Sequence, residues 1–405
     1  MSKKVVTSLF ILTAVLSTIW VCLVPNEPIS DQIIYHQRSA AMAAGQGLYN
    51  DDAHINMFWA PGYSIYLAAF YLIGGNHYYI AFLANIICYI ALVMGTFALT
   101  QKIYSTSVAR VAAVAVAIYP GFLFYTTIFA SELLFTALIV WAAYFSWRSF
   151  DEDHPWNRKT VISGFLYGAA TLVRPQALIM GLLLPVLAWT HSKKLRQGVV
   201  RAVIVTAMVL TVCLPWGYRN YHKFGSYVLV SANFGHNLWM GNNPNSTEGY
   251  NKIDDVVDGI NIKNMGQLER DHFLRKKALE YISQHPWEYF KLILKRFYIA
   301  MKSESISVTW NKIGITNGLS EAAYLPLKIS ANLIYYLVMG TFLISIISKI
   351  KEKTFQRKDI FLCCSIVILS VPFLLIQAQD RFHLPLIPFV IMIAASKLSK
   401  FYSFS

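Results

Sequence analysis

Ten apolar runs divide this chain of 405 residues, and they constrain its fold more than any other feature. The composition agrees, because 56% of the residues are hydrophobic and the mean hydropathy is +0.45. A helix that crosses a bilayer needs about 20 mainly apolar residues. We therefore predict an all-α polytopic membrane protein with about ten transmembrane helices. The runs cover residues 5–24, 77–99, 108–125, 128–147, 161–173, 177–190, 199–215, 329–347, 360–376 and 384–396, and the fifth and sixth are short enough to be tilted or partly re-entrant.

The basic residues between the runs indicate the orientation of the chain. Lys and Arg in short loops are retained on the cytoplasmic side, and the basic clusters fall on one side when the runs alternate. Both termini are then cytoplasmic, and the run after Lys3 and Lys4 is interpreted as a retained signal anchor. The net charge of +14 is explained by loops that face anionic lipid, and no nucleic-acid motif accompanies it.

The polar stretches predict three parts. Residues 1–216 form an N-terminal transmembrane module, whose first outer loop covers residues 25–76. Residues 217–328 form a small mixed cap outside the membrane, and residues 329–405 add C-terminal transmembrane helices.

The cap sequence predicts its own local structure. Alternating apolar residues and β-branched side chains over 223–230 predict a strand or an extended segment. Periodic apolar residues predict helices over 265–283 and 286–301, with Arg296 on the polar side of the second helix.

The first outer loop begins with Asp31, a few residues beyond the first apolar run. The residues after Asp31 suit a short amphipathic helix along the membrane interface, where a carboxylate can take up a proton. Asp31 could equally cap that helix, since Asp is a preferred N-cap residue. The loop continues through the sequence Trp-Ala-Pro-Gly-Tyr, which ends at Tyr63 and opens a second short outer helix over 61–73.

Charged residues stand at the outer ends of later runs. Glu132 lies at the start of an apolar run, where an ionisable group is costly unless it faces a cavity or a partner. Arg174 ends the fifth run, where its guanidinium could bind a lipid phosphate or anchor the helix to ordinary headgroups. In the last outer turn, Asp380 and Arg381 could pair with each other, or Arg381 could bind phosphate.

The start of the cap is rich in asparagine, glycine and aromatic residues. Amide side chains in such loops can hydrogen-bond sugar hydroxyls. Trp239 and Tyr250 could stack on a sugar ring, although interfacial aromatic residues more often anchor a protein in the membrane. The polar residues in this segment are Arg219, Lys223, Asn233, His236 and Asn242.

Several of these segments together resemble the GT-C glycosyltransferases, polytopic enzymes that use polyprenyl-phosphate sugars. The branch of protein mannosyltransferases and lipid A aminoarabinose transferases is the most similar. The resemblance implies a GT-C type bundle with outer juxtamembrane helices, and it places the catalytic role on Asp31. It is carried by the first outer loop, Ser131-Glu132, Leu172-Val173-Arg174-Pro175, the segment from Pro215 to Pro244, and Arg381-Phe382 with Pro385.

The resemblance also implies a reaction and a location. A sugar would move from a polyprenyl (undecaprenyl) phosphate to a hydroxyl of a glycan, lipid or protein outside the bacterial inner membrane, in modification of the cell envelope or lipopolysaccharide. The reaction needs a base for the acceptor and cations for the leaving phosphate. We predict Asp31 as the base and Arg174, Arg219 and Arg381 as phosphate ligands. Predicted substrate contacts are His36, Asp51, Asp52, His54, Tyr63, Glu132, Asn233, His236 and Asn242, with Lys223 as a further cation.

One carboxylate base predicts inversion at the anomeric carbon. Retention would need a second carboxylate, and Asp51, Asp52 or Glu132 could supply it. We predict no cofactor, although Asp31, Asp51, Asp52 and His54 could hold a divalent cation. The five cysteines lie in or beside apolar runs, so neither disulfides nor a zinc site is predicted.

Two other functions fit part of the pattern. An O-antigen polymerase or ligase also combines many spans with a large outer loop, but it would be organised around the later loop and would not need Asp31. A lipid or solute transporter should show internal repeats and charged or broken helices near the middle of the membrane. Here the polar residues gather at one face.

Overall fold

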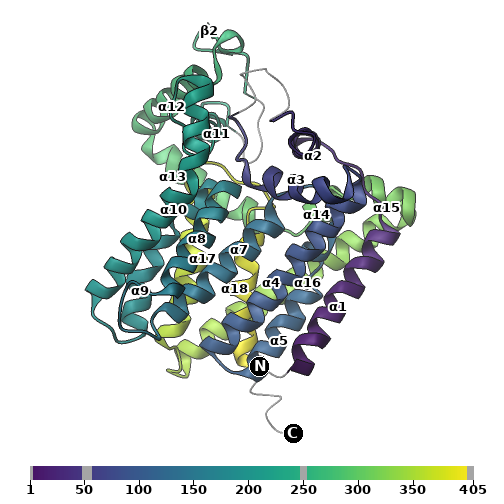
Figure 1. The fold of residues 1–405 in the computed structure, drawn as a ribbon, viewed down its shortest axis with the longest axis vertical. Helices are drawn as coiled ribbons and strands as arrows, with labels where there is room; N and C mark the ends of the chain where they lie inside the picture. The colour runs from purple at the N-terminus through teal and green to yellow at the C-terminus, as the bar shows by residue number, and fades with distance from the viewer. Residues whose placement is uncertain (1–2, 48–56, 247–252, 399–405) are drawn as a thin grey trace.

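A bundle of long helices carries a smaller cap at one end in the computed structural model, which describes residues 3–47, 57–246 and 253–398 (Figure 1). Within these ranges, five helices are long and apolar enough to cross a membrane, or six if one bent pair counts as a single span. The prediction of about ten crossings is therefore not confirmed. The five helices are α1 (Lys3–Leu23), α4 (Tyr78–Ile103), α10 (Leu195–Phe224), α16 (Tyr324–Lys351) and α17 (Arg357–Leu375).

The other predicted spans form shorter helices, and prolines mark two of the breaks between them. In the bent pair, the chain turns by 47° where Pro120 opens α6. Pro175 follows α8 and begins a 3₁₀ segment, since proline has no N–H to continue the α-helix. The shorter elements are α5 (Thr106–Ala117), α6 (Pro120–Phe124), η1 (Tyr125–Thr127), α7 (Glu132–Ser149), α8 (Arg158–Val173), η2 (Pro175–Leu182), α9 (Leu183–Thr190), η5 (Leu384–Leu386) and α18 (Ile387–Leu398).

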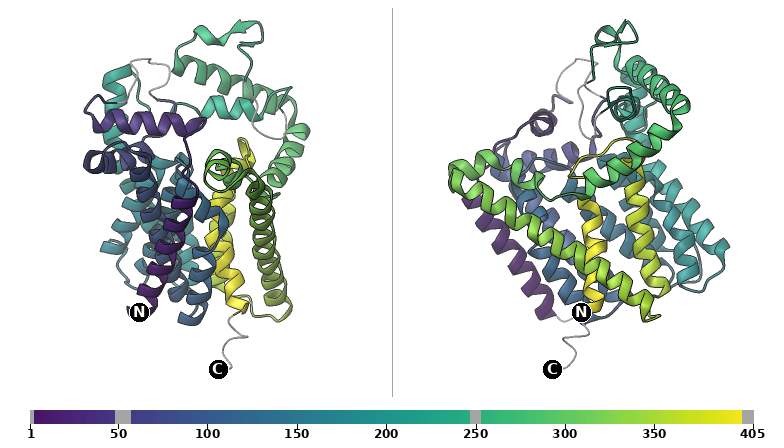
Figure 2. Two further views of the ribbon diagram at one scale, coloured as in Figure 1. Left: turned by 90° about the vertical axis from the view of Figure 1, so that its right-hand side faces the viewer. Right: turned by 180° about the vertical axis from the view of Figure 1, so that it is seen from behind.

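The start of α1 and the end of α18 lie at the end of the bundle opposite the cap (Figures 1 and 2).

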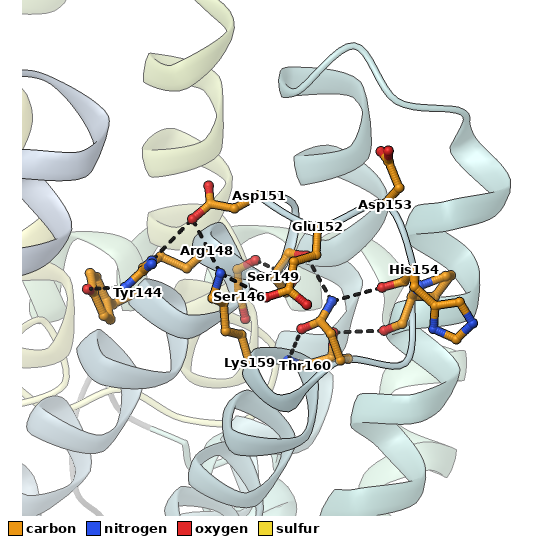
Figure 3. Close-up of polar contacts among 12 residues, drawn as sticks. Tyr144, Ser146, Arg148, Ser149, Asp151, Glu152, Asp153, His154, Lys159 and Thr160 are labelled. Atoms are coloured by element: carbon orange, nitrogen blue, oxygen red, sulfur yellow. Dashed lines mark hydrogen bonds and ion pairs between the residues drawn. The ribbon is translucent and has the colours of Figure 1, made fainter.

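The loop between α7 and α8 is held in place by charged and capping contacts (Figure 3). Arg148 bonds both Tyr144 and Asp151, and the Asn157 side chain caps α8 by accepting from the amide of Thr160 at 3.0 Å.

Two outer helices, α2 (Asp31–Ala43) and α3 (Gly62–Gly74), lie across the capped end of the bundle (Figures 1 and 2). Both helices predicted in this loop are thus confirmed. Ser30, with a φ of 51°, occupies the N-cap position of α2, and Asp31 is the first helical residue. The interpretation of Asp31 as a mere N-cap is therefore wrong.

The cap is built around two helices and one hairpin. Asp258 and Gly259, with φ values of 50° and 76°, form the turn of an antiparallel pair in which Val257 opposes Ile260. Trp239 is buried in the small apolar core of the cap, so it cannot stack on a sugar. The elements are α11 (Phe234–Gly241), β1 (Val256–Val257), β2 (Ile260–Asn261), η3 (Ile262–Asn264), α12 (Gln267–Gln284) and α13 (Pro286–Met301).

The boundary predicted near residue 216 falls inside α10, which continues through Pro215 to Phe224. Gly225 then ends the helix in the left-handed conformation with a φ of 68°. Side chains of α10 fold the next segment back, since Trp216 donates to the carbonyl of Val230 and Asn220 to that of Val228, both at 2.8 Å. The predicted strand over 223–230 is absent from the described chain for this reason.

Arg296 corrects the predicted polar face of α13. Its side chain is buried and donates to the carbonyls of Leu374 and Leu375 at the end of α17, and to the side-chain oxygen of Asn242. Arg296 therefore joins the cap to the bundle. The chain then returns to the outer end of α1 through α14 (Ile306–Thr309), α15 (Lys312–Gly318) and η4 (Glu321–Ala323).

Candidate functional site

A cavity of about 800 Å³ lies where the cap meets the adjacent ends of the bundle helices. Its walls come from the start of α2, the end of α8 with η2, α11 in the cap, and the loop after α17. Leu178, Ile179 and Pro372 form part of an apolar wall. The charged and polar lining residues include Asp31, Arg174, Asn233, His236, Arg270 and Arg381.

Asp31 and Arg381 form an ion pair on the cavity wall. Asp31 Oδ2 lies 3.6 Å from Arg381 Nη2, and the Asp31 side chain is 42% exposed. Arg381 also stacks on the ring of Trp310, at 4.6 Å from its centroid, and donates to the side chain of Gln379 at 2.9 Å. The predicted alternative of a pair between Asp380 and Arg381 is wrong, because Arg381 turns to Asp31.

Glu132 lies beneath this pair and contacts two arginines. Its side chain is 1% exposed, and Oε1 lies 2.5 Å from Arg174 Nη2 and 3.6 Å from Arg381 Nη1. Arg174 also donates to the hydroxyl of Ser131 at 2.9 Å. Glu132 therefore holds both guanidinium groups at the cavity. The two cations in turn stabilise Glu132, because a buried carboxylate needs cationic partners.

Burial and charge act in opposite directions on Arg381. Burial alone would lower the pKa of Arg381, but the carboxylates of Glu132 and Asp31 raise it above its ordinary value. The guanidinium is thus a permanent cation. The ion-paired set of Asp31, Glu132, Arg174 and Arg381 has two negative and two positive groups.

Aromatic side chains form the wall next to Asp31. Tyr35 lines the cavity, and its ring meets that of Tyr63 edge to face at 5.2 Å. Burial is the main cause that raises the pKa of Tyr35. Tyr63 itself is buried and donates to Asn85 at 3.1 Å, so it supports this wall from behind. Phe58 and Trp59 add further lining.

The cap contributes the opposite wall. Asn233 and His236 lie there with Arg270. The backbone N–H of His236 donates to Asp271 Oδ1 at 3.1 Å, and no partner for its ring Nδ1 is found among the described residues. Burial, with a smaller effect of Arg270, lowers the pKa of His236 to about 4. The imidazole is therefore neutral near pH 7.

Three predicted site residues lie elsewhere. His36 contacts the hydroxyl of Tyr71 at 2.8 Å and lines a separate cavity of about 330 Å³. Arg219 bonds Asn220 at 2.9 Å and stacks on Trp216 and Phe224, and it does not line the larger cavity. Asn242 is fully buried. Its side-chain amide donates to the carbonyls of Leu238 and Ile376, and its side-chain oxygen accepts from Arg296.

Asp51, Asp52, His54 and Tyr250 lie outside the described residues. The suggested divalent cation site needs three of them, so it stays a prediction. Within residues 3–47, 57–246 and 253–398, no group of three or more His, Cys, Asp or Glu residues is placed to hold a metal ion.

Several site residues were not predicted from the sequence. Tyr35 follows Asp31 by four positions on a helix, and this spacing places both residues on one face. Gln379 and Trp310 hold Arg381, and Arg270 comes from the cap. No local signal marks the last three, because their neighbours in space are distant in sequence.

Comparison with known proteins gives one family match and similar folds. Residues 59–218 match the family described as dolichyl-phosphate-mannose-protein mannosyltransferase. A search of curated protein sequences gives no significant match. The oligosaccharyltransferase of Archaeoglobus fulgidus, tethered to an acceptor peptide, is 14% identical with a TM-score of 0.58 over 99% of this chain and 50% of that one.

A second structure of the archaeal enzyme, in complex with an inhibitory peptide and a dolichol-phosphate, is 13% identical with a TM-score of 0.57 over 98% of this chain and 50% of that one. This chain thus spans about half the length of these structures. ArnT from Cupriavidus metallidurans, bound to undecaprenyl phosphate, has 12% identity and a TM-score of 0.45 over 99% of this chain and 79% of that one.

Proposed function

We propose that this chain, a multi-pass membrane protein with the GT-C glycosyltransferase fold, transfers a sugar from a polyprenyl phosphate to an acceptor hydroxyl. The matched family is described by a dolichyl-phosphate-mannose donor, and a similar structure binds dolichol-phosphate. The observation that carries the proposal is the contact of Asp31 with Arg381 on the wall of a cavity at one end of the bundle.

The cavity has the two kinds of group that the reaction needs. A partly exposed carboxylate, Asp31, is available to accept the proton of the acceptor hydroxyl. Arg174 and Arg381 supply guanidinium groups, which can bind the oxygens of a phosphate in a planar, bidentate way. Glu132 fixes both guanidinium groups before substrate binds, so little reorganisation is needed during the reaction.

The bond changes follow from these roles. The acceptor O–H gives its proton to Asp31, and the acceptor oxygen forms a bond to the anomeric carbon. The bond between that carbon and the phosphate oxygen breaks, and its electron pair stays on the phosphate. When Asp31 becomes neutral, its hold on Arg381 weakens, so more of the guanidinium charge can act on the leaving phosphate.

The carboxylates support inversion at the anomeric carbon. Among the described residues that line the cavity, Asp31 is the only carboxylate. Glu132 is buried against two arginines, which leaves it unsuited to attack a sugar. A retaining mechanism needs a second carboxylate as a nucleophile, about 5 Å from the first.

The wall chemistry suggests where each substrate lies. Leu178, Ile179 and Pro372 face the cavity from the membrane helices and would contact the prenyl chain. Asn233 and His236 face it from the cap and would contact the acceptor or the sugar. The ion-paired set is neutral overall, so Arg270 adds the positive charge that an incoming phosphate diester needs.

The proposal places the reaction at the outer face of the bacterial inner membrane, with both termini cytoplasmic. The acceptor would be a glycan, a lipid or a protein of the cell envelope. The polar wall residues gather at one end of the bundle, which favours a transferase over a transporter that would need a polar path across the membrane.

The test uses purified protein in lipid nanodiscs with undecaprenyl-phosphate mannose and with the corresponding glucose and aminoarabinose donors. Transfer predicts release of undecaprenyl phosphate that depends on an added acceptor extract and is lost in Asp31→Asn. Movement of intact donor without cleavage would indicate a transporter. Release that is unchanged in Asp31→Asn would contradict the assignment of the base and favour a polymerase or ligase.

A further inference from the structure

A buried polar cluster lies behind the cavity and contains Glu304, His383 and Tyr119. None of the three side chains is exposed. His383 Nε2 and the hydroxyl of Tyr119 both contact Glu304 Oε2, at 2.9 Å and 2.7 Å. His383 Nδ1 contacts the carbonyl oxygen of Ala300 at 2.8 Å. The cluster joins segments that lie far apart in the sequence.

The contacts require one proton between Glu304 and His383. A carbonyl oxygen only accepts, so His383 Nδ1 carries a hydrogen and donates it to Ala300. Nε2 and Oε2 are then close enough to need a second hydrogen between them, either on the imidazolium or on the carboxylic acid. Tyr119 donates to the same Oε2 atom in both cases.

Glu304 depends on this pair. Its second oxygen, Oε1, has no hydrogen-bond partner among the described residues. A buried carboxylate without a proton or a cation is strongly disfavoured, so His383 is the group that allows Glu304 to be buried. Gly121 packs directly on the pair, since a Cβ atom at that position would lie 2.7 Å from Glu304 Oε2.

His383 also ends the loop that carries Arg381. The loop is held by short turns, in which the amide of Phe382 donates to Gln379 and that of Leu384 to Arg381. Trp310, which stacks on the guanidinium of Arg381, is the first residue after α14. Glu304 lies two positions before that helix begins. The segment 304–310 therefore contacts both His383, through Glu304, and the guanidinium of Arg381, through Trp310.

We propose that the Glu304–His383 pair is a positioning device that holds Arg381 against Asp31 and Glu132 through one shared proton. The proposal rests on the proposed function for the role of Arg381. Glu304 and His383 do not line the cavity, so they act through the loop. Breaking the pair releases His383 from its anchor and lets the loop and Arg381 shift.

Other charged or titratable groups surround the pair. Tyr335 places its ring 4.9 Å from that of His383, and its hydroxyl donates to the carbonyl of Met301 at 2.7 Å. Asp380, in the same loop, interacts electrostatically with His383, with Lys302 after α13 and with Glu304. Tyr335 donates to Met301 and not to Glu304, which makes Tyr335→Phe a matched control.

The first test needs no ligand. Hydrogen–deuterium exchange of the peptide spanning residues 377–386 is measured for the wild type, Glu304→Ala, Glu304→Gln and Tyr335→Phe. We expect exchange at least tenfold faster in Glu304→Ala, and near the wild-type rate in Tyr335→Phe. Glu304→Gln should restore most of the protection, because its amide can donate to His383 Nε2. Unchanged exchange in Glu304→Ala would overturn the inference.

The second test asks whether Glu304 acts through Arg381. Binding of undecaprenyl phosphate is measured for Glu304→Ala, for Arg381→Ala and for the double variant. We expect Glu304→Ala to weaken binding at least tenfold alone and to have no further effect when Arg381 is already absent. If Glu304→Ala weakened binding equally with and without Arg381→Ala, Glu304 would have only a general role in stability. Absence of binding by the wild type would instead contradict the proposed function, and the exchange experiment would still decide the role of the pair.

Discussion

Asp31 Oδ2 lies 3.6 Å from Arg381 Nη2, although one residue stands near the start of the chain and the other near its end. The contact brings a carboxylate and a guanidinium group to the same wall of one cavity, and under the proposed function they are the proton acceptor and a phosphate ligand. Glu132 and Trp310 fix the cation from two further directions. The proposed reaction depends on this arrangement.

Asp31→Asn should lower kcat by about 10²- to 10⁴-fold, the usual contribution of a general base. The amide keeps the size of the side chain and its place at the start of α2, so the protein should still fold and insert. Glu27→Gln is the matched control, because Glu27 is an exposed carboxylate in the same loop and does not line the cavity. Equal activity of the two variants would exclude Asp31 as the base.

Arg381→Lys should weaken undecaprenyl phosphate binding by about 10- to 100-fold, since lysine cannot form the bidentate contact of a guanidinium. Arg219→Lys should bind within about twofold of the wild type, because a group outside the cavity loses no phosphate contact. Binding can be followed with the lipid in nanodiscs. A larger loss of binding in Arg219→Lys than in Arg381→Lys would indicate that the phosphate binds outside the cavity.

Glu132→Gln should lower both the free energy of unfolding and the affinity for lipid phosphate. Loss of one partner from a buried ion pair costs about 3–5 kcal/mol, and here two guanidinium groups lose their common carboxylate. Thermal unfolding in detergent and lipid binding measure the two effects. Glu288→Gln removes an exposed pair with Lys291 and should change neither quantity appreciably.

Protonation of the buried His236 should lower the free energy of unfolding in acid. Because burial lowers the pKa of His236 from 6.5 to about 4, the unfolded chain binds a proton more readily than the folded chain. Its stabilising effect is therefore complete above pH 6.5 and is lost as the pH falls toward about 4. His236→Gln should flatten this part of the stability curve, measured by thermal unfolding between about pH 4 and pH 7. The exposed His272→Gln should leave the curve unchanged.

Local patterns in the sequence were sufficient to predict much of the fold. The apolar runs predicted a helical membrane protein. Helices α3, α12 and α13 were found close to their predicted ranges, and α2 was found where a short helix after Asp31 was predicted. The number of crossings was not confirmed, because Pro120 divides the run over 108–125 and the sixth run is divided between η2 and α9. The predicted strand or extended segment over 223–230 is not a strand, because α10 continues to Phe224 and side chains of α10 fold the following segment back.

The site was predictable where one residue carries a strong chemical preference. Asp31, Arg174 and Arg381 stood out because charges at the ends of apolar runs are rare, and all three line the cavity. Burial could not be foreseen for Asn242 and Arg296, which bind each other and the end of α17. Such contacts depend on how distant segments pack.

Asp31, Arg174 and Arg381 on the cavity wall come from the early, middle and late parts of the chain, on α2, after α8 and after α17. During synthesis, a polypeptide that has only entered the membrane as far as α10 holds Asp31 and Arg174 but lacks Arg381. Such a nascent chain lacks part of the ion-paired set on the cavity wall. Under the proposed function, cleavage of the lipid-linked donor therefore begins only after the final helices have been inserted.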